Sequence, residues 1–153
     1  MTARSVISLS GMEKSDQSTN LWGIEPKMTV DEELVEYLGQ YVTENKRTKI
    51  QSALENRTRH VTIALEEIYQ PHNASACLRN CDCLGFQDVH IIENRNEYRP
   101  NEGVAMGSSK WLTIHRYRQT SEAVRQLRAI GYRIVATTPN RAGCTPSTLD
   151  LES

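Results

Sequence analysis

Three polar residues that could act on a substrate, His72, Asn73 and Arg79, follow the first apolar, β-branched run of the sequence. That run, residues 61–65, has the composition of a strand buried in a sheet. Ligands of open parallel sheets bind beyond the carboxyl ends of the strands, where these side chains would lie. From residue types alone we favour the simpler interpretation, in which Asn73 caps a helix and Arg79 is solvated.

Other catalytic patterns are missing from the sequence. It has no Gly-rich phosphate loop, no G-x-S-x-G elbow, no HExxH and no tight carboxylate pair. The C-x3-C-x-C spacing of residues 77–83 lacks the paired C-x2-C knuckles of zinc sites, so we expect no metal. We expect reduced, mostly buried thiols at Cys77, Cys81, Cys83 and Cys144.

The charge is unevenly distributed along the chain. The net charge is −1, but residues 46–59 hold five basic residues and one acidic residue. Residues 110–133 hold six basic residues and one acidic residue. Two basic segments indicate a polyanionic partner, and the alternative is a pair of solvated helix faces. On charge alone we favour solvated faces.

The elements that must position these residues follow from the apolar periodicity. A capping box at residues 29–32 predicts a helix start, and a second helix carries Ile50, Ala53 and Leu54 on one face. Further on, we expect strands at 61–65, 89–92, 112–115 and 134–137, and helices that start at Asn73 and at Thr120 or Ser121 and end at Gly85 and Gly131. Such alternation predicts βαβ units and a parallel sheet. The sheet looks unfinished, because the chain stops where another strand is expected.

Length and composition favour one globular domain with a short extension. The chain has 153 residues, of which 38% are hydrophobic and 24% charged, and a mean hydropathy of −0.56. No apolar run approaches the roughly 18 residues of a membrane span. The N-terminus has no apolar core of a secretory signal, so we expect a cytoplasmic protein.

One stretch of the sequence strongly resembles the first motif of the SpoU/TrmH family of RNA ribose 2′-O-methyltransferases, in the SPOUT superfamily. The matching segments are VTIALEEIYQPHNASACLRNCD (61–82), GFQDVH (85–90), MGSSKWL (106–112) and ATTP (136–139). The resemblance covers roughly residues 44–150. The basic helix before the first strand looks like the TrmH subgroup, which methylates a D-loop guanosine in tRNA.

The resemblance implies roles for the matched residues. Arg79 would be the catalytic arginine, which binds the adjacent phosphate and stabilises alkoxide charge on the ribose 2′-oxygen. Asn73 would hold Arg79 or the loop in place. The remaining matched positions would bind RNA, chiefly through phosphates: Lys46, Lys49, Arg57, His72 and Lys110.

The resemblance also implies a fold and a boundary. We expect N-terminal helices followed by an incomplete SPOUT-type, Rossmann-like and mainly parallel α/β sheet, which is knotted when complete. The family's second and third motifs, with the knot and the S-adenosylmethionine pocket, would lie beyond residue 153. We expect a flexible extension at 1–28, a basic RNA-binding helical segment at 29–58 and the N-terminal part of the methyltransferase domain at 59–153.

Three classes of function stay open at this point. The first is S-adenosylmethionine-dependent 2′-O-methylation of tRNA, or of rRNA, by a full-length parent that is a homodimer, with the chain as given inactive. The second is a non-catalytic RNA-binding module, and the third is a flavodoxin-like small-molecule domain. The residues that match the family favour the first class.

Overall fold

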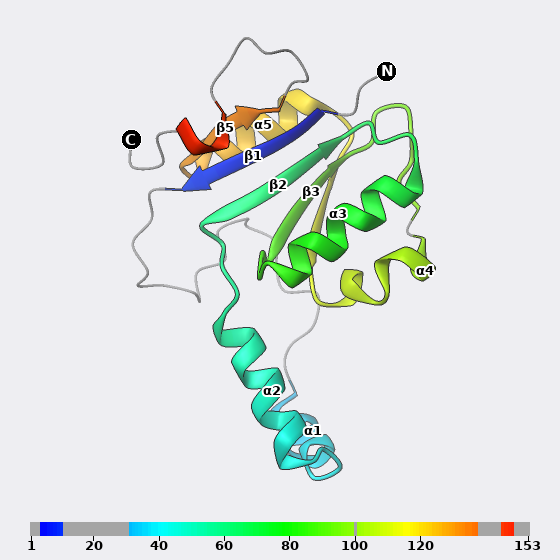
Figure 1. The fold of residues 1–153 in the computed structure, drawn as a ribbon, viewed down its shortest axis with the longest axis vertical. Coiled ribbons are helices and arrows are strands. Elements are labelled where there is room, and N and C mark those ends of the chain that lie inside the picture. The colour runs from blue at the N-terminus through cyan, green and yellow to red at the C-terminus, as the bar shows by residue number, and fades with distance from the viewer. Residues whose placement is uncertain (1–3, 11–30, 100, 138–144, 149–153) are drawn as a thin grey trace.

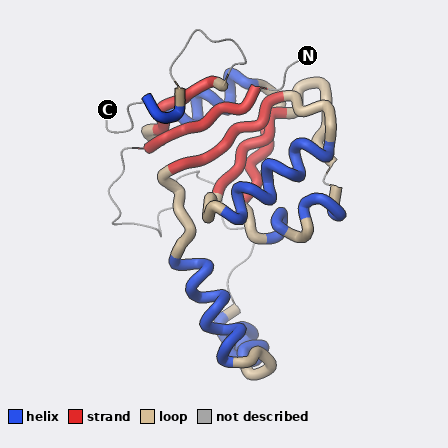
Figure 2. The backbone as a smooth tube through the Cα atoms, in the orientation of Figure 1, coloured by secondary structure: helices blue, strands red, loops and turns tan. Residues whose placement is uncertain are grey.

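The computed structural model describes residues 4–10, 31–99, 101–137 and 145–148. Figures 1 and 2 show a twisted sheet with helices on both sides and a helical segment that extends away from it. The elements in chain order are β1 (Arg4–Ser10), α1 (Glu32–Gly39), α2 (Glu44–Glu55), β2 (Val61–Glu66), α3 (Pro71–Cys83), β3 (Asp88–Ile92), α4 (Glu102–Ala105), a 3₁₀ turn (Ser108–Lys110), β4 (Thr113–Tyr117), α5 (Thr120–Ala129), β5 (Tyr132–Ala136) and a 3₁₀ turn (Pro146–Thr148).

The predicted parallel sheet is present at the centre of the molecule. The strand order is β4-β3-β2-β1-β5, and β2, β3 and β4 run parallel. Ile63 pairs with Val89, and Val89 pairs with Ile114. The apolar runs form these strands because helices cover both faces of this part of the sheet.

Residues 4–10 differ from the expectation of a flexible extension over 1–28. They form β1, which is antiparallel to β2 on one side and to β5 on the other. Val6 pairs with both Ala64 and Ala136. Two neighbouring strands satisfy the backbone of a serine-rich segment that has little apolar signal of its own. The rest of the expected extension, residues 1–3 and 11–28, lies outside the described residues.

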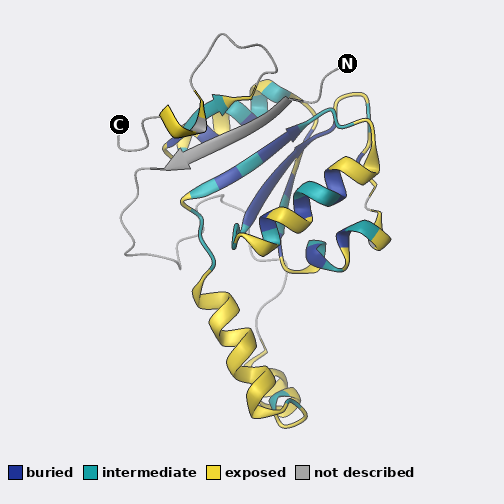
Figure 3. Cartoon of the chain, viewed as in Figure 1, coloured by how far each residue is buried: buried dark blue, intermediate teal, exposed yellow. Residues whose placement is uncertain are grey.

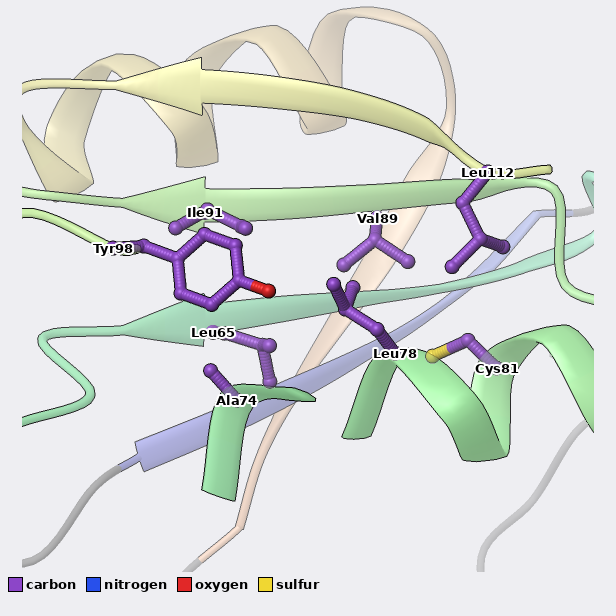
Figure 4. Close-up of a cluster of buried hydrophobic side chains, with 8 residues drawn as sticks. All are labelled: Leu65, Ala74, Leu78, Cys81, Val89, Ile91, Tyr98 and Leu112. Carbon is purple, nitrogen blue, oxygen red and sulfur yellow. The ribbon is translucent and has the colours of Figure 1, made fainter. Parts of the chain in front are cut away.

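The main core lies between the sheet and α3. Leu65, Val89 and Ile91 from the strands pack with Leu78 and Cys81 of α3, and these five side chains are at most 4% exposed (Figure 4). Helical spacing places Ala74, Leu78 and Cys81 on one face of α3, and that face is buried. This packing fixes the orientation of the helix that carries Asn73 and Arg79.

A buried polar cluster lies on the other side of β3, toward α5. Asp88 and His90 are fully buried, and His115 is nearly so. His115 Nε2 lies 2.8 Å from Asp88 Oδ1, and Arg59 Nη1 lies 3.2 Å from Asp88 Oδ2. His90 Nδ1 lies 3.1 Å from the Tyr117 hydroxyl. Burial, and to a lesser degree the neighbouring His115, lower the pKa of His90 to about 3.

Helices α1 and α2 form an arm that has no buried residue (Figure 3). The cap of α1 is Asp31, whose side chain accepts from the Leu34 amide, so the helix begins two residues later than a cap at Thr29 would place it. Asp31 can cap because its short carboxylate reaches the amide three residues on. Thr29 itself lies outside the described residues.

Two other predicted helix starts are displaced by one or more residues. The cap of α3 is Gln70 and not Asn73, because Pro71 occupies the first helical position. The cap of α5 is Gln119, so Thr120 already lies inside the helix. The predicted ends are correct: Gly85 and Gly131 follow their helices with φ values of +77° and +91°.

Candidate RNA-modification site

The loop between β2 and α3 is held at its α3 end by contacts between Gln70 and Asn73. Asn73 Nδ2 lies 3.3 Å from Gln70 Oε1, and the Asn73 amide donates to the Gln70 carbonyl at 3.0 Å. These two contacts link Asn73 to the residue that precedes α3. It makes no hydrogen bond to Arg79, which lies six residues further along the helix.

Arg79 is exposed on the solvent face of α3. Its guanidinium forms no ion pair or hydrogen bond with the described residues, so it is available to an anionic ligand. His72 is also exposed and lies seven residues before Arg79. Seven residues are two helical turns, so both side chains share one side of α3, about 10 Å apart along its axis.

Lys110 lies at the opposite edge of the sheet from His72. It ends the 3₁₀ turn before β4 and is exposed. The adjoining Trp111 is fixed by its carbonyl, which accepts from Gln87 Nε2 at 3.2 Å. Since α3 runs from the carboxyl edge of β2 back to this edge, Arg79 lies between the two positions along the helix.

Lys46 and Lys49 are exposed on α2, one turn apart. Neither ammonium group is paired with an acid in the described ranges. Arg47, between them, donates to the Gly39 carbonyl at 3.3 Å and so links α2 to α1. The two lysines project from an arm that extends away from the sheet (Figure 1). The structure thus places them apart from His72 and Asn73.

Arg57 has contacts that differ from the expected phosphate-binding role. Its side chain is only 12% exposed, forms an ion pair with Asp82 of α3, and donates to the Phe86 carbonyl at 3.2 Å. The adjacent Thr58 amide donates to the Gly85 carbonyl at 2.8 Å. Arg57 therefore joins the arm to the sheet domain. Its charge is neutralised by a residue 25 positions away, which the sequence does not reveal.

Glu67 is a residue of this site that the sequence analysis missed. It has a φ of +50°, which is rare for a non-glycine residue. Its carboxylate accepts from the amides of Asn94 and Arg95 and, at 3.1 Å, from Asn96 Nδ2. It thereby ties the loop after β2 to the loop after β3. The available signal was an acidic residue directly after a buried strand.

The cysteines of α3 are packed in or beside the core. Burial raises the pKa of Cys81 to about 12, and burial also raises that of Cys77. Cys83 is exposed, and Cys144 lies outside the described residues. Within the described ranges, no group of three or more His, Cys, Asp or Glu side chains could hold a metal ion. Cys81 is therefore a packing residue.

Comparison with known proteins decides the family. Residues 60–152 match the model of the SpoU rRNA Methylase family. The chain belongs to this family. The SpoU/TrmH resemblance of the sequence is thus confirmed, and its first motif is the segment that forms β2 and α3.

Several relatives of this SpoU family chain share one name with each other. The tRNA (guanosine(18)-2′-O)-methyltransferase of Borreliella burgdorferi is 38% identical over 116 residues, which are 76% of this chain and 51% of the relative. The enzyme of that name from Thermus thermophilus is 33% identical over 95 residues, 62% of this chain and 49% of the relative. The chain spans about half the length of these curated relatives.

A solved structure also matches this SpoU family chain. The A. aeolicus TrmH/SpoU tRNA modifying enzyme is 26% identical, with a TM-score of 0.48, and the match covers 56% of this chain and 44% of that one.

In the described parts of the present chain, no helix has the length and apolar character needed to cross a membrane.

Proposed function

We propose that this chain belongs to an S-adenosylmethionine-dependent enzyme that methylates the ribose 2′-hydroxyl of a D-loop guanosine in tRNA. The observation that carries the proposal is the family match over residues 60–152, joined to relatives that are named tRNA (guanosine(18)-2′-O)-methyltransferase. We further propose that the complete protein is a cytoplasmic homodimer, as such a substrate and family suggest.

Arg79 is the proposed catalytic residue. Its exposed guanidinium has no acidic partner among the described side chains, and it can only donate hydrogen bonds. A ribose hydroxyl that loses its proton develops negative charge, which a positioned guanidinium stabilises. Its planar fork can also bind the neighbouring phosphate through two hydrogen bonds. Asn73 acts as a positioning residue through Gln70.

The use of S-adenosylmethionine is part of this proposal and rests on the family match. Acidic side chains at the carboxyl edge already have partners: Glu66 accepts from Thr120, Glu67 binds the loop after β3, and Glu93 pairs with Arg116. A carboxylate could accept hydrogen bonds from the amino group or the ribose hydroxyls of the cofactor, but these three carboxylates already bind protein donors. The cofactor would supply the methyl group when bound.

Lys46, Lys49, Lys110 and His72 are the proposed RNA contacts. All four are exposed, and the three lysines would bind phosphates without reading the base. The lysines lie on two separate parts of the molecule, the arm and the turn before β4. A substrate that contacts all of them must be large enough to reach both the arm and the turn before β4, as a folded tRNA is.

The test is a methyl-transfer assay with the full-length protein, radiolabelled cofactor and tRNA transcripts. We expect label on a single D-loop guanosine, and no label when that nucleotide carries a 2′-deoxyribose. Transfer to rRNA but not to tRNA would replace the proposed substrate with rRNA. RNA binding without any methyl transfer would overturn the enzymatic proposal and leave a binding module.

A further inference from the structure

Two exposed side chains at the carboxyl edge of the sheet have no role in the function proposed above. Tyr69 lies in the loop between β2 and α3 and is 80% exposed. Arg95 lies in the loop after β3 and is also exposed. An exposed aromatic ring offers a flat apolar face on which a ligand can stack.

Glu67 holds the two loops together, and Figure 1 shows them side by side beyond β2 and β3. The Arg95 amide donates to Glu67 Oε1 at 2.9 Å, and the Glu67 amide donates to the Ile92 carbonyl at 3.0 Å. Tyr69 follows Glu67 by two residues. The backbone that carries the ring and the backbone that carries the guanidinium are thus fixed to the same carboxylate.

The loop that carries Tyr69 is also fixed on its other side. Ile68 is partly buried against the main core, and Pro71 begins α3. Gln70 and Asn73 are joined by their side chains. Tyr69 therefore lies between two anchored positions. An aromatic ring on such a short, anchored loop loses little conformational entropy when it binds a planar group.

Arg95 is an available cation at this edge. The neighbouring acids have partners: Glu93 pairs with Arg116, and Glu97 lies 3.3 Å from Arg99. Arg95 forms no ion pair with a side chain in the described ranges. Its guanidinium can therefore bind an anion without breaking an existing interaction.

We propose that Tyr69 and Arg95 form a nucleotide subsite, in which Tyr69 stacks on an unpaired base of RNA and Arg95 binds a phosphate beside it. The inference rests on the proposed RNA function and adds a contact to a base at the same edge as Asn73. Unpaired bases in RNA loops stack on aromatic side chains, whereas bases inside a duplex are not accessible to them. Every base has a flat face, so the subsite tolerates different bases.

The experiment measures binding of the full-length protein to a short single-stranded RNA that carries 2-aminopurine, and to tRNA. Tyr69→Ala should weaken binding by about 10-fold or more and remove the fluorescence change that stacking causes. Tyr69→Phe should retain both. Arg95→Ala should lower the slope of log affinity against log salt by about 0.7. Matched controls are Leu84→Ala, an exposed apolar side chain outside the proposed RNA contacts, and Arg99→Ala, a change at an arginine that is already paired with Glu97.

The outcomes separate this inference from the proposed function. If the wild type binds and methylates tRNA but Tyr69→Ala binds both RNAs as the wild type does, the subsite is wrong and the enzyme assignment stands. If Leu84→Ala weakens binding as much as Tyr69→Ala, the subsite is also wrong. If the wild-type protein binds no RNA, the proposed function fails, and the subsite fails with it.

Discussion

The imidazole rings of His90 and His115 are stacked, with centroids 4.7 Å apart and 12° between their planes. They come from adjacent positions of the parallel strands β3 and β4, which pair His90 with His115. Two protonated rings at this separation would repel each other strongly inside the protein. The Asp88 carboxylate lies beside one member of the pair, with Oδ1 2.8 Å from His115 Nε2.

The burial of His90, next to His115, predicts that the protein loses stability in mild acid. His90 has a pKa of about 3 in the folded state and 6.5 as its ordinary value, so the unfolded chain binds a proton first. Its contribution is therefore complete above pH 6.5 and falls as the pH drops toward 3, by up to about 1.4 kcal/mol per pH unit. Urea unfolding at pH 7, 6 and 5 should show the slope, and His90→Asn should reduce it. An equal pH dependence of the unfolding free energy in the wild type and in His90→Asn would show that His90 is not the cause.

Arg57→Ala should destabilise the fold more than it weakens RNA binding. The change leaves the Asp82 carboxylate and the Phe86 carbonyl without their guanidinium donor, which should cost about 1–3 kcal/mol. Chemical denaturation of Arg57→Ala, Asp82→Ala and the double variant measures the coupling between the two residues. Additive effects, together with a reduced salt dependence of RNA binding, would restore the phosphate-binding role.

Gly85→Ala should be more damaging than Gly131→Ala. Both glycines have a φ that alanine rarely adopts, which costs roughly 1–2 kcal/mol for either change. A Cβ at Gly85 would also lie 2.6 Å from the Asn56 carbonyl oxygen, whereas a Cβ at Gly131 meets no atom within 4 Å among the described residues. The difference between the two variants in unfolding free energy measures the cost of the contact between a Cβ at Gly85 and the Asn56 carbonyl. Equal destabilisation would show that the backbone at Asn56 yields without cost.

Replacement of Lys46, Lys49 and Lys110 by alanine should reduce the salt dependence of RNA binding. Each phosphate contact that is lost should lower the slope of log affinity against log salt by about 0.7–0.9, for unrelated sequences alike. Stability should not change, because all three side chains are exposed and unpaired in the described chain. An unchanged slope in the triple variant would identify them as solvated charges.

Arg79→Ala in the full-length protein should lower methyl transfer by about 10²–10³-fold at unchanged melting temperature. Arg79→Lys should also fail, because one ammonium group cannot replace two parallel hydrogen bonds. Arg128→Ala, a change at an exposed arginine of α5, is a matched control for the loss of charge. Near-normal turnover of Arg79→Ala would exclude this residue from the reaction.

The sequence predicts the strands that are buried on both faces, and it does so for a physical reason. Residues 61–65 and 89–92 are short runs of apolar and β-branched residues, interrupted by Thr62 and His90, and this length and composition favour a buried strand. β1 was missed because its serines alternate with apolar residues in only one short run, and both of its partners are distant in sequence. Pairing of that kind is decided by tertiary structure.

The candidate site shows the same division. The exposure of Arg79 follows from its place opposite Leu78 and Cys81 on the helix, which the periodicity reveals. The role of Arg57 does not follow from its position among basic residues, because its partner Asp82 belongs to another helix. Asn73 is an intermediate case: a proline at the first helical position could have identified Gln70 as the cap.

The position of β1 has a consequence for how the chain reaches its native state. Among the described strands, β1 is synthesised first, and β5, which pairs with its outer edge, is synthesised last. Contacts between such distant segments slow folding, because the intervening chain must be ordered before they form. Until β5 is made, the outer edge of β1 is open to a strand of another molecule. Rapid synthesis at high concentration should therefore favour aggregation through this edge, and slower synthesis at low temperature should favour the native sheet.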